Sequence, residues 1–376
     1  MNRLDRQCAI DARTATLTTL TTLGREAASA GPLPVTAGDV ERAAAALDGI
    51  VTRTPVLSSV EADLQTGAQV FFKCENFQRT GAFKFRGAYH AILRLDAAQR
   101  RAGVIAYSSG NHAQGIALAA RMLDTPATVV MPADAPAPKV RAARDWGARV
   151  VFYDRLHENR ETICDTLARE SGATVIASSD HPDVIAGQGT VARELFAETG
   201  PLDYLFAPVG GGGLISGCAI TANHWAPNCR VIGVEPERGN DAQLSLSAGQ
   251  IVRIAPPDTI ADGARNQWIG ALALPIMQAH VRQIETVSDD ALRAQMRFFA
   301  ERMKLVVEPT GCLAAAAVMG GALDLRGARV GVVISGGNAD FSLLADALTQ
   351  PCAPAAEARA RTAHTADTAD TADTAS

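Results

Sequence analysis

A lysine between two phenylalanines is the residue of this sequence best suited to covalent chemistry. Lys84 follows a Thr-Gly turn in the segment 75–88 and stands at the head of an apolar helical pattern. Apolar neighbours exclude water from an ammonium group, which lowers its pKa and frees the amine to form a Schiff base. A surface lysine at a helix start is the ordinary alternative, so Lys84 alone does not decide the chemistry.

A short polar loop follows the strand that is predicted to end at Tyr107. Residues 108–115 read Ser-Ser-Gly-Asn-His-Ala-Gln-Gly, and small residues before a helix expose backbone N–H groups that can bind a carboxylate. The amide of Asn111 can hydrogen-bond a phenolic oxygen. His112 is either a general base or, as is more common for such a position, a structural histidine.

Two glycine-containing loops also follow predicted strands. Four glycines and a leucine, Gly210, Gly211, Gly212, Gly213 and Leu214, allow several backbone N–H groups to reach one phosphate. They match neither the GxxxxGK[ST] spacing of a nucleotide P-loop nor the GxGxxG spacing of dinucleotide folds. In the second loop, Ser335-Gly336-Gly337-Asn338, the Ser335 hydroxyl could meet a ring nitrogen, although a serine cap at an ordinary turn explains this loop as well.

Short β-branched runs that alternate with helical patterns must position these loops. The predicted strands are residues 70–72, 104–107, 127–131, 149–152, 174–177, 204–208, 230–234 and 330–334. The predicted helices include 111–123, 156–170 and 289–304, the last with Ser288 as its N-cap. This alternation predicts an α/β fold with parallel sheets flanked by helices, whose ligands gather at the carboxyl ends of the strands.

Composition narrows the classes of function. The 376 residues are 47% hydrophobic and carry a net charge of -5, which gives no basic excess for nucleic acid or an anionic membrane. No apolar run approaches the roughly 18 residues that cross a bilayer. Seven scattered cysteines without a CxxC pair favour a reduced, cytoplasmic location.

The two ends of the chain differ in composition from its body. Residues 1–34 are rich in Thr, Ala and Arg and lack the apolar stretch of a secretory signal, which predicts a disordered extension, with an organelle leader as the alternative. Residues 349–376 end in Thr-Ala-Asp repeats with almost no apolar surface to bury, which predicts a disordered tail. The expected compact body runs from Val35 to Leu348.

In their order along the chain, these four loops resemble the motifs of the fold-type II pyridoxal-phosphate family, which contains threonine and serine dehydratases and serine racemases. The resemblance covers nearly all of residues 35–348. It implies a two-lobed α/β fold of the tryptophan synthase β type, with a large domain of residues 35–95 and 177–348. Residues 96–176 would form the small domain, the cofactor would lie between the two, and the protein would be a homodimer.

The resemblance also implies roles for single residues. Lys84 would carry pyridoxal 5'-phosphate as a Schiff base, Phe83 would pack on the ring and Asn111 would contact its 3-hydroxyl. The phosphate would lie on the glycine loop of residues 210–214, and Ser335 would face the ring nitrogen. The substrate carboxylate would bind the loop made of Ser108, Ser109, Gly110, Asn111 and His112. The residue that matches Ser109 is a second acid/base in the family's racemases, which leaves racemisation open.

A divalent-cation site is a further implication of the resemblance. Glu235, the carbonyl of Gly239 and Asp241 match the protein ligands of the family's site, and oxygen ligands suit Mg²⁺, Mn²⁺ or Ca²⁺. A solvated acidic turn is the alternative.

The expected activity is the removal of water from a β-hydroxy amino acid. A threonine or serine dehydratase, an ammonia-lyase of amino-acid metabolism, would release a 2-oxo acid and ammonia. Serine racemase, 3-hydroxyaspartate dehydratase and phenylserine dehydratase are the alternatives, and Arg265, in the unassigned segment 264–268, could bind a second carboxylate or pair with the body. A non-catalytic sensor would not need to keep Lys84, Ser109 and Asn111 together, and a nicotinamide-dependent oxidoreductase would need the GxGxxG spacing.

Overall fold

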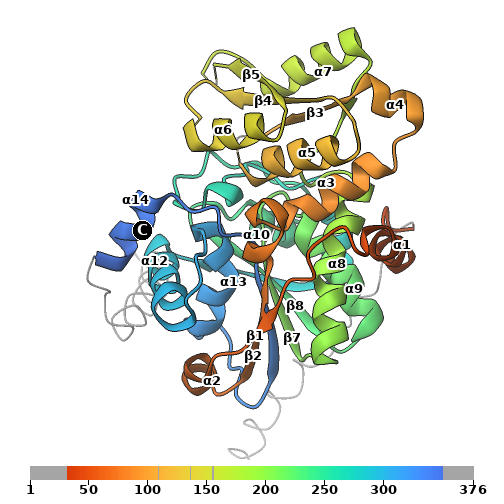
Figure 1. Cartoon of the computed structure of the whole chain (residues 1–376). Coiled ribbons are helices and arrows are strands. Elements are labelled where there is room, and N and C mark those ends of the chain that lie inside the picture. The colour runs from red at the N-terminus through yellow and green to blue at the C-terminus, as the bar shows by residue number, and fades with distance from the viewer. Residues whose placement is uncertain (1–31, 109, 136, 155, 350–376) are drawn as a thin grey trace, which may run out of the picture. The chain divides into compact units, whose positions relative to one another are not determined.

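Two sheets organise the part of the chain that begins at Pro34 (Figure 1). The computed structural model describes residues 32–349 with the exception of residues 109, 136 and 155. The predicted N-terminal extension (1–34) and C-terminal tail (349–376) lie outside the described residues, apart from residues 32–34 and 349. The α/β fold class is confirmed.

The large sheet has six strands in the order β1–β2–β10–β7–β8–β9. Their bounds are β1 Val56–Leu57, β2 Gln69–Cys74, β10 Arg329–Ile334, β7 Tyr204–Pro208, β8 Arg230–Pro236 and β9 Val281–Val287. The neighbouring pairs β2–β10, β10–β7, β7–β8 and β8–β9 are all parallel, and β1 pairs antiparallel with β2 at one edge. The loops after β2, β7, β8 and β10 therefore meet along one edge of this sheet.

The small sheet has four parallel strands in the order β5–β4–β3–β6. Their bounds are β3 Val104–Tyr107, β4 Ala127–Pro132, β5 Arg149–Tyr153 and β6 Thr174–Val175. The helices around it are α4 (Ala97–Ala102), α5 (Asn111–Met122), α6 (Ala137–Asp145) and α7 (Arg160–Ser171). All four strands fall inside the predicted small domain, whose boundaries at residues 96 and 176 stay a prediction.

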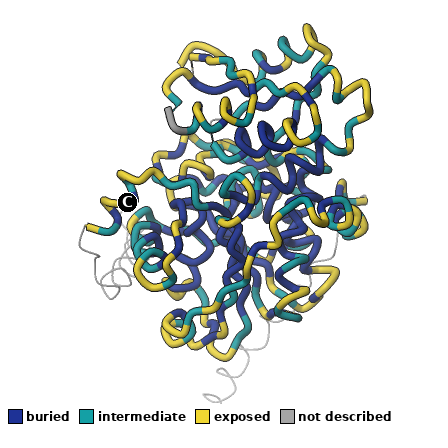
Figure 2. Tube along the Cα trace, viewed as in Figure 1, coloured by how far each residue is buried: buried dark blue, intermediate teal, exposed yellow. Residues whose placement is uncertain are grey.

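Helices cover both faces of the large sheet. Along β10, Val330, Val332 and Ile334 pack in one core cluster with helix α13 (Pro309–Met319), whereas Val333 packs in a second cluster with α9 (Gly213–Trp225). Alternating side chains of a strand point to opposite faces, so α13 and α9 lie on opposite sides. Figure 2 shows burial concentrated along these strands and helices. The remaining helices are α1 (Ala37–Leu47), α2 (Val60–Thr66), α3 (Lys84–Leu93), α8 (Pro182–Thr199), α9 (Gly213–Trp225), α10 (Asp241–Ala248), α11 (Ala273–His280), α12 (Asp289–Phe298), α13 (Pro309–Met319) and α14 (Phe341–Thr349).

Local capping explains where the predicted helices differ from the observed ones. The helix expected over 156–170 begins at Arg160, because the Asn159 side chain accepts the N–H groups of Glu161 and Thr162. The helix expected over 289–304 is α12 followed by a π-helical turn, Phe299–Met303. Ser288 caps α12 as predicted, since its Oγ accepts the N–H of Ala291.

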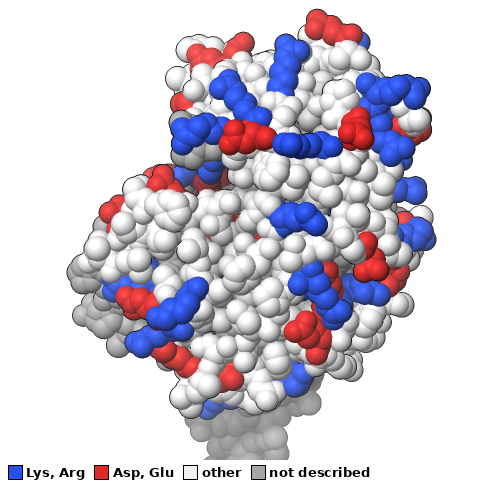
Figure 3. Space-filling model, in the orientation of Figure 1, with Lys and Arg blue, Asp and Glu red and all other residues white. Residues whose placement is uncertain are grey.

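The surface carries charges of both signs. On the face drawn in Figure 3, Lys, Arg, Asp and Glu side chains are interspersed and densest over the small sheet. Interspersed charges of this kind do not produce a large field of one sign on this face. In the part of the chain that the structure describes, no helix has the length and apolar character that crossing a membrane requires.

Candidate active site

Lys84 is the first residue of α3, and its amine is buried. Nζ donates a hydrogen bond to the carbonyl oxygen of Ser178 at 2.7 Å and lies 5.0 Å from the centre of the Phe83 ring. Removal of the ammonium from water lowers the pKa of Lys84 to about 8. A sizeable fraction of the amine is therefore unprotonated near neutral pH, as Schiff-base chemistry requires.

The other lysines of the chain have different surroundings. The sequence contains four lysines, all within the described residues: Lys73, Lys84, Lys139 and Lys304. Lys73 is paired with Glu194 at 2.6 Å, Lys139 is paired with Asp262, and Lys304 is exposed. Lys84 is half-buried and has no carboxylate partner among the described residues, which favours it over the other three as the attachment point.

The loop before Lys84 is fixed by the loop after β10. Ala82 forms an antiparallel bridge with Gly336, and the N–H of Phe83 donates to the carbonyl of Ser335 at 3.1 Å. Ser335 is only 2% exposed, so its hydroxyl lies inside the molecule beside the Phe83–Lys84 pair. The structure thus brings together two of the four loops that the sequence singled out.

Asn111 begins α5, and its side-chain amide forms hydrogen bonds with Glu308 and with Asn338. Its Nδ2 donates to Oε1 of Glu308 at 2.6 Å, and its Oδ1 accepts from Nδ2 of Asn338 at 2.9 Å. Burial and the nearby carboxylate of Asp262 raise the pKa of Glu308 to about 7, against the opposing effects of Asn111 and Lys139. Glu308 was not predicted from the sequence, although an acidic residue directly before the mostly apolar helix α13 was a signal that could have revealed it.

His112 has the surroundings of a structural histidine. It is 2% exposed, and its Nε2 lies 3.0 Å from the carbonyl of Ile176, a distance at which Nε2–H donates. Burial and the charge of Lys84 lower the pKa of His112 to about 3, so the ring is neutral at pH 7. A base that weak has little tendency to take a proton near neutral pH, which favours the structural alternative over a general base.

Part of the predicted substrate loop can be followed directly. The N–H of Ser108 donates to the carbonyl of Val130, and the N–H of Gly110 donates to Oγ of Ser108. Ser109 lies outside the described residues. The loop precedes α5, so the N–H groups of the first helical turn have no intrahelical acceptor and can bind an anion.

The glycine loop leaves no room for larger residues. A Cβ on Gly211 would come within 2.2 Å of Ser179 Oγ, and one on Gly213 within 2.7 Å of Gln188 Oε1. Gly212 adopts a left-handed φ of 87°. Gly213 and Leu214 open helix α9, whose first N–H groups lack intrahelical partners. This cradle, with its free N–H groups, fits a phosphate.

Two residues that the sequence analysis missed connect this cradle to Lys84. The Nε2 of Gln188 donates to the same Ser178 carbonyl that accepts from Lys84, and Gln188 is fully buried. Its Oε1 has no hydrogen-bond partner among the described residues. A polar side chain between two glycines in an otherwise apolar helical run was the available signal for Gln188.

Glu235 and Asp241 form a buried carboxylate pair at the predicted cation site. Both Glu235 oxygens accept backbone N–H groups, from Ala242 and Gln243, while both Asp241 oxygens lack a hydrogen-bond partner among the described residues. Burial raises the pKa of both groups, to about 7 for Asp241, and for Glu235 the adjacent carboxylate adds to the rise. Unpartnered buried oxygens fit an oxygen-preferring divalent cation.

The donor set of this site is small. Within the ranges that the structure describes, no group of three or more His, Cys, Asp or Glu side chains is arranged to hold a metal ion. A cation would thus be held by two carboxylates and a carbonyl, with Gly239 the predicted carbonyl donor. Waters complete the coordination of Mg²⁺ and Ca²⁺ at such sites.

Arg265 remains available for a ligand. The side chain is exposed, and its Nε donates to the carbonyl of Thr259 at 2.8 Å. No ion pair links it to another described residue, so the expected alternative, a salt bridge to the body, is not observed there; its contact with the body is the hydrogen bond to Thr259. The next residue, Asn266, lies against the glycine loop, because a Cβ on Gly210 would come within 2.9 Å of its Oδ1.

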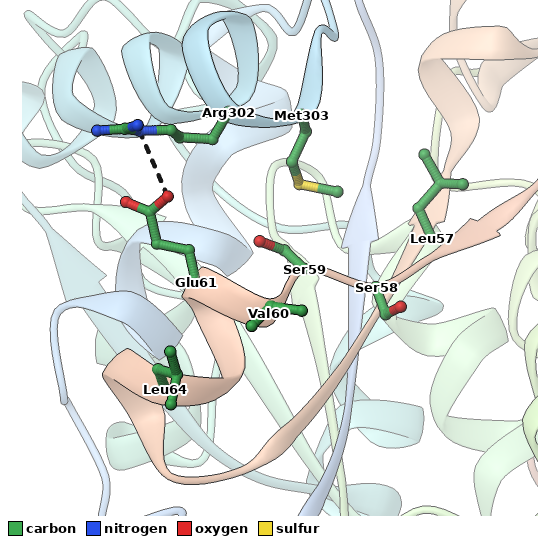
Figure 4. A pocket seen from close by; sticks show the side chains of 8 residues that line it. All are labelled: Leu57, Ser58, Ser59, Val60, Glu61, Leu64, Arg302 and Met303. Atoms are coloured by element: carbon green, nitrogen blue, oxygen red, sulfur yellow. Dashed lines mark ion pairs between the residues drawn. The ribbon is translucent and has the colours of Figure 1, made fainter.

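A surface pocket of about 600 Å³ lies away from these motifs (Figure 4). Arg302 and Glu61 form an ion pair at 3.3 Å beside it. The lining contains none of the predicted cofactor, substrate or cation residues; it consists of Leu57, Ser58, Ser59, Val60, Glu61, Leu64, Arg302 and Met303. The candidate active site is therefore defined by the contacts around Lys84 and not by this pocket.

Comparison with known proteins finds relatives over most of the chain. The family model described as "Pyridoxal-phosphate dependent enzyme" matches residues 47–336. L-threo-3-hydroxyaspartate ammonia-lyase from Pseudomonas sp is 58% identical over 310 residues, which cover 82% of this chain and 97% of the relative. Serine racemase from Schizosaccharomyces pombe is 51% identical over 312 residues, which cover 83% of this chain and 97% of the relative.

A solved structure shares the fold over nearly its whole length. Serine racemase from Dictyostelium discoideum superposes with a TM-score of 0.78 at 37% identity, covering 82% of this chain and 99% of that chain. The family match over residues 47–336 thus contains every strand of both sheets, β1 to β10, and the first three of the four loops in full.

Proposed function

We propose that this chain, which belongs to the pyridoxal-phosphate dependent enzyme family, removes water from L-threo-3-hydroxyaspartate; the imine formed in this way then takes up water and releases oxaloacetate and ammonia. It is a pyridoxal-phosphate-dependent ammonia-lyase of the β-elimination and racemase group. The 58% identity with an L-threo-3-hydroxyaspartate ammonia-lyase carries the choice of substrate. This identity favours 3-hydroxyaspartate dehydratase, one of the alternatives from the sequence, over the threonine or serine dehydratase that the sequence analysis expected as the main activity.

The residues around Lys84 can perform this reaction. Pyridoxal phosphate, when bound, withdraws electrons from the substrate α-carbon. In this proposal, Lys84 Nζ holds the cofactor and then accepts the α-proton, since its lowered pKa makes it a base near neutral pH. Asn111 and Ser335 orient the ring, and the N–H groups of the glycine loop (210–214) bind the phosphate.

A dicarboxylate substrate needs a second cationic partner. The α-carboxylate would bind the N–H groups of the loop 108–112, as the sequence analysis expects. For the β-carboxylate we assign Arg265, because its terminal N–H groups have no partner among the described residues and its neighbour Asn266 touches the glycine loop. A guanidinium can donate two parallel hydrogen bonds to a carboxylate, and serine and threonine lack this second carboxylate.

Product analysis tests the proposed substrate. The purified, cofactor-loaded protein would be assayed for 2-oxo acid and ammonia release from L-threo-3-hydroxyaspartate, L-serine, L-threonine and L-threo-phenylserine. We expect the highest kcat/KM with hydroxyaspartate and no release by Lys84→Ala. Arg265→Gln should lower kcat/KM for hydroxyaspartate much more than for L-serine. A higher kcat/KM for serine or threonine in the unaltered protein would overturn the choice of substrate.

Serine racemisation is a second candidate, supported by the 51% identity with serine racemase and by the presence of Ser109. A racemase needs an acid on the face of the substrate opposite the lysine, and a serine hydroxyl can serve there. We predict that Ser109→Ala spares water elimination and removes any D-serine formation, measured by chiral chromatography. Equal loss of both activities would show that Ser109 acts in the steps they share.

The proposal also includes a divalent cation, a homodimeric assembly and a cytoplasmic location. A divalent cation would bind Glu235, Asp241 and the Gly239 carbonyl and stabilise the loop after β8. A homodimer and a cytoplasmic location follow from the resemblance and from the scattered cysteines respectively. Size-exclusion chromatography with light scattering would distinguish a dimer from a monomer.

A further inference from the structure

Glu308 lies at the edge of the candidate site, and no motif assigns it a role. We propose that Glu308 is a positioning residue, which holds the amide of Asn111 in one orientation and thereby fixes the group that meets the cofactor ring hydroxyl. The proposal rests on the assignment of Asn111 to the cofactor but not on the identity of the substrate.

The side chain of Glu308 has little freedom to move. It is 3% exposed, and its backbone N–H donates to the carbonyl of Gly336 at 3.1 Å, directly before Pro309 opens α13. A Cβ on Gly336 would come within 2.3 Å of Oε1, so this oxygen lies against the glycine backbone. The acceptor that faces Asn111 is therefore held from two sides.

A chain of hydrogen bonds determines which way the Asn111 amide faces. Nδ2 of Asn338 donates to the carbonyl of Thr80 at 2.7 Å and to Oδ1 of Asn111 at 2.9 Å, which uses both of its N–H groups. Oδ1 of Asn111 must then face Asn338, and Nδ2 must face Glu308. One N–H of Asn111 and Oε2 of Glu308 remain without a protein partner among the described residues, so a bound group can engage them.

This contact also links the two sheet layers. Asn111 opens α5, which packs on β3 and β4 of the small sheet, whereas Glu308 and Asn338 follow elements of the large-sheet layer. The ion pair between Lys139 of α6 and Asp262 is a second link between the layers. A shift of one layer against the other would therefore move Asn111 away from Glu308.

The hydrogen bond from Asn111 to Glu308 can form whether Glu308 is protonated or ionised. Burial and Asp262 raise its pKa to about 7, Asn111 and Lys139 act in the opposite direction, and Cys312 on its own helix is the remaining titratable neighbour. A carboxylate and a neutral carboxyl both offer an oxygen that accepts from Asn111 Nδ2. Glutamine offers the same acceptor without a titrating proton, whereas leucine offers none.

Cofactor affinity of the apoprotein separates these variants. We expect Glu308→Gln to bind pyridoxal phosphate within about twofold of the unaltered protein, and Glu308→Leu to raise Kd by on the order of tenfold, the effect of one lost hydrogen bond. Asn338→Ala, a change at a half-buried position, should weaken binding in the same direction because it frees Asn111 Oδ1. Absorbance titration measures Kd, and circular dichroism of each apoprotein checks its folding.

A double-mutant cycle with Asn111→Ala decides whether Glu308 acts through Asn111. If it does, Glu308→Leu and Asn338→Ala cause no further loss of affinity in the Asn111→Ala background. An unchanged Kd in folded Glu308→Leu, or an equal further loss without Asn111, would overturn the proposal. If Glu308→Leu does not fold, Asn338→Ala gives the same two outcomes. Because cofactor binding is measured without substrate, a wrong substrate assignment leaves this result unaffected.

Discussion

At the residue scale, the chemistry depends on the surroundings of Lys84. Its amine lies against the Phe83 ring and donates to the Ser178 carbonyl, and no carboxylate among the described residues contacts it to stabilise the ammonium form. Burial therefore lowers the pKa from the ordinary 10.5 to about 8. The same group can carry a cofactor and accept a proton because it is a free amine within the physiological range.

The pH dependence of cofactor attachment tests this account of Lys84. We predict that the apoprotein reacts with pyridoxal phosphate about tenfold faster per pH unit below the pKa and at a constant rate above it, since only the unprotonated amine attacks. Stopped-flow absorbance would locate the midpoint, expected at about 8. A midpoint near the ordinary value of 10.5 would show that burial does not control this amine.

The sequence singled out residues in distinctive motifs, whose roles stay predictions, but it did not reveal the residues that contact them. Lys84, Asn111 and Ser335 stand in unusual loops after strands, and the structure brings these loops together. Glu308 lies 197 residues after Asn111, the residue that it contacts. Gln188 lies only 10 residues after Ser178, but its Oε1 also lies against Gly213 of the glycine loop. Only the tertiary fold places them there, and a single acidic or amide side chain in an apolar helix carries little signal on its own.

At the scale of elements, the glycine loop between β7 and α9 is the most constrained segment of the site. We predict that Gly211→Ala raises the Kd for pyridoxal phosphate by on the order of tenfold or more, because its Cβ would lie 2.2 Å from Ser179 Oγ. Titration of the apoprotein gives this Kd. Gly38→Ala, in helix α1 with no neighbour closer than 3.5 Å, is the matched control and should leave it unchanged. Wild-type affinity in Gly211→Ala would mean that the phosphate binds elsewhere.

The strands followed from the pattern of apolar residues with two exceptions, β1 and β9. β-branched runs predicted the inner strands, because these are buried on both faces and read as continuous apolar segments. β9 was missed, since Arg282, Gln283 and Glu285 interrupt its apolar residues at the edge of the large sheet. β1 was missed because it has only two residues, and its pairing with β2 depends on the tertiary fold.

At the scale of the whole molecule, a divalent cation should stabilise the fold. The pKa of Asp241 is raised from 3.8 to about 7, so the folded protein without cation loses stability relative to the unfolded chain as pH rises between these values. A cation binds the ionised pair, and its stabilising effect should therefore grow as pH rises through about 7.

Thermal unfolding with and without Mg²⁺, Mn²⁺ or Ca²⁺, at about one pH unit below and above 7, measures this effect. We expect a higher Tm with cation, most clearly at the higher pH, and no cation-dependent shift in Asp241→Asn. The absence of any shift with all three cations at the higher pH would rule out a cation site at Glu235 and Asp241.

Identification of the lysine that carries the cofactor tests the whole account most directly. The loaded protein would be reduced with borohydride, digested and analysed by mass spectrometry, and the four lysines of the chain fall in separate regions of the sequence. We predict that the reduced pyridoxyl group will be found on the peptide that contains Lys84. Its presence on Lys73, Lys139 or Lys304 instead would contradict the central claim.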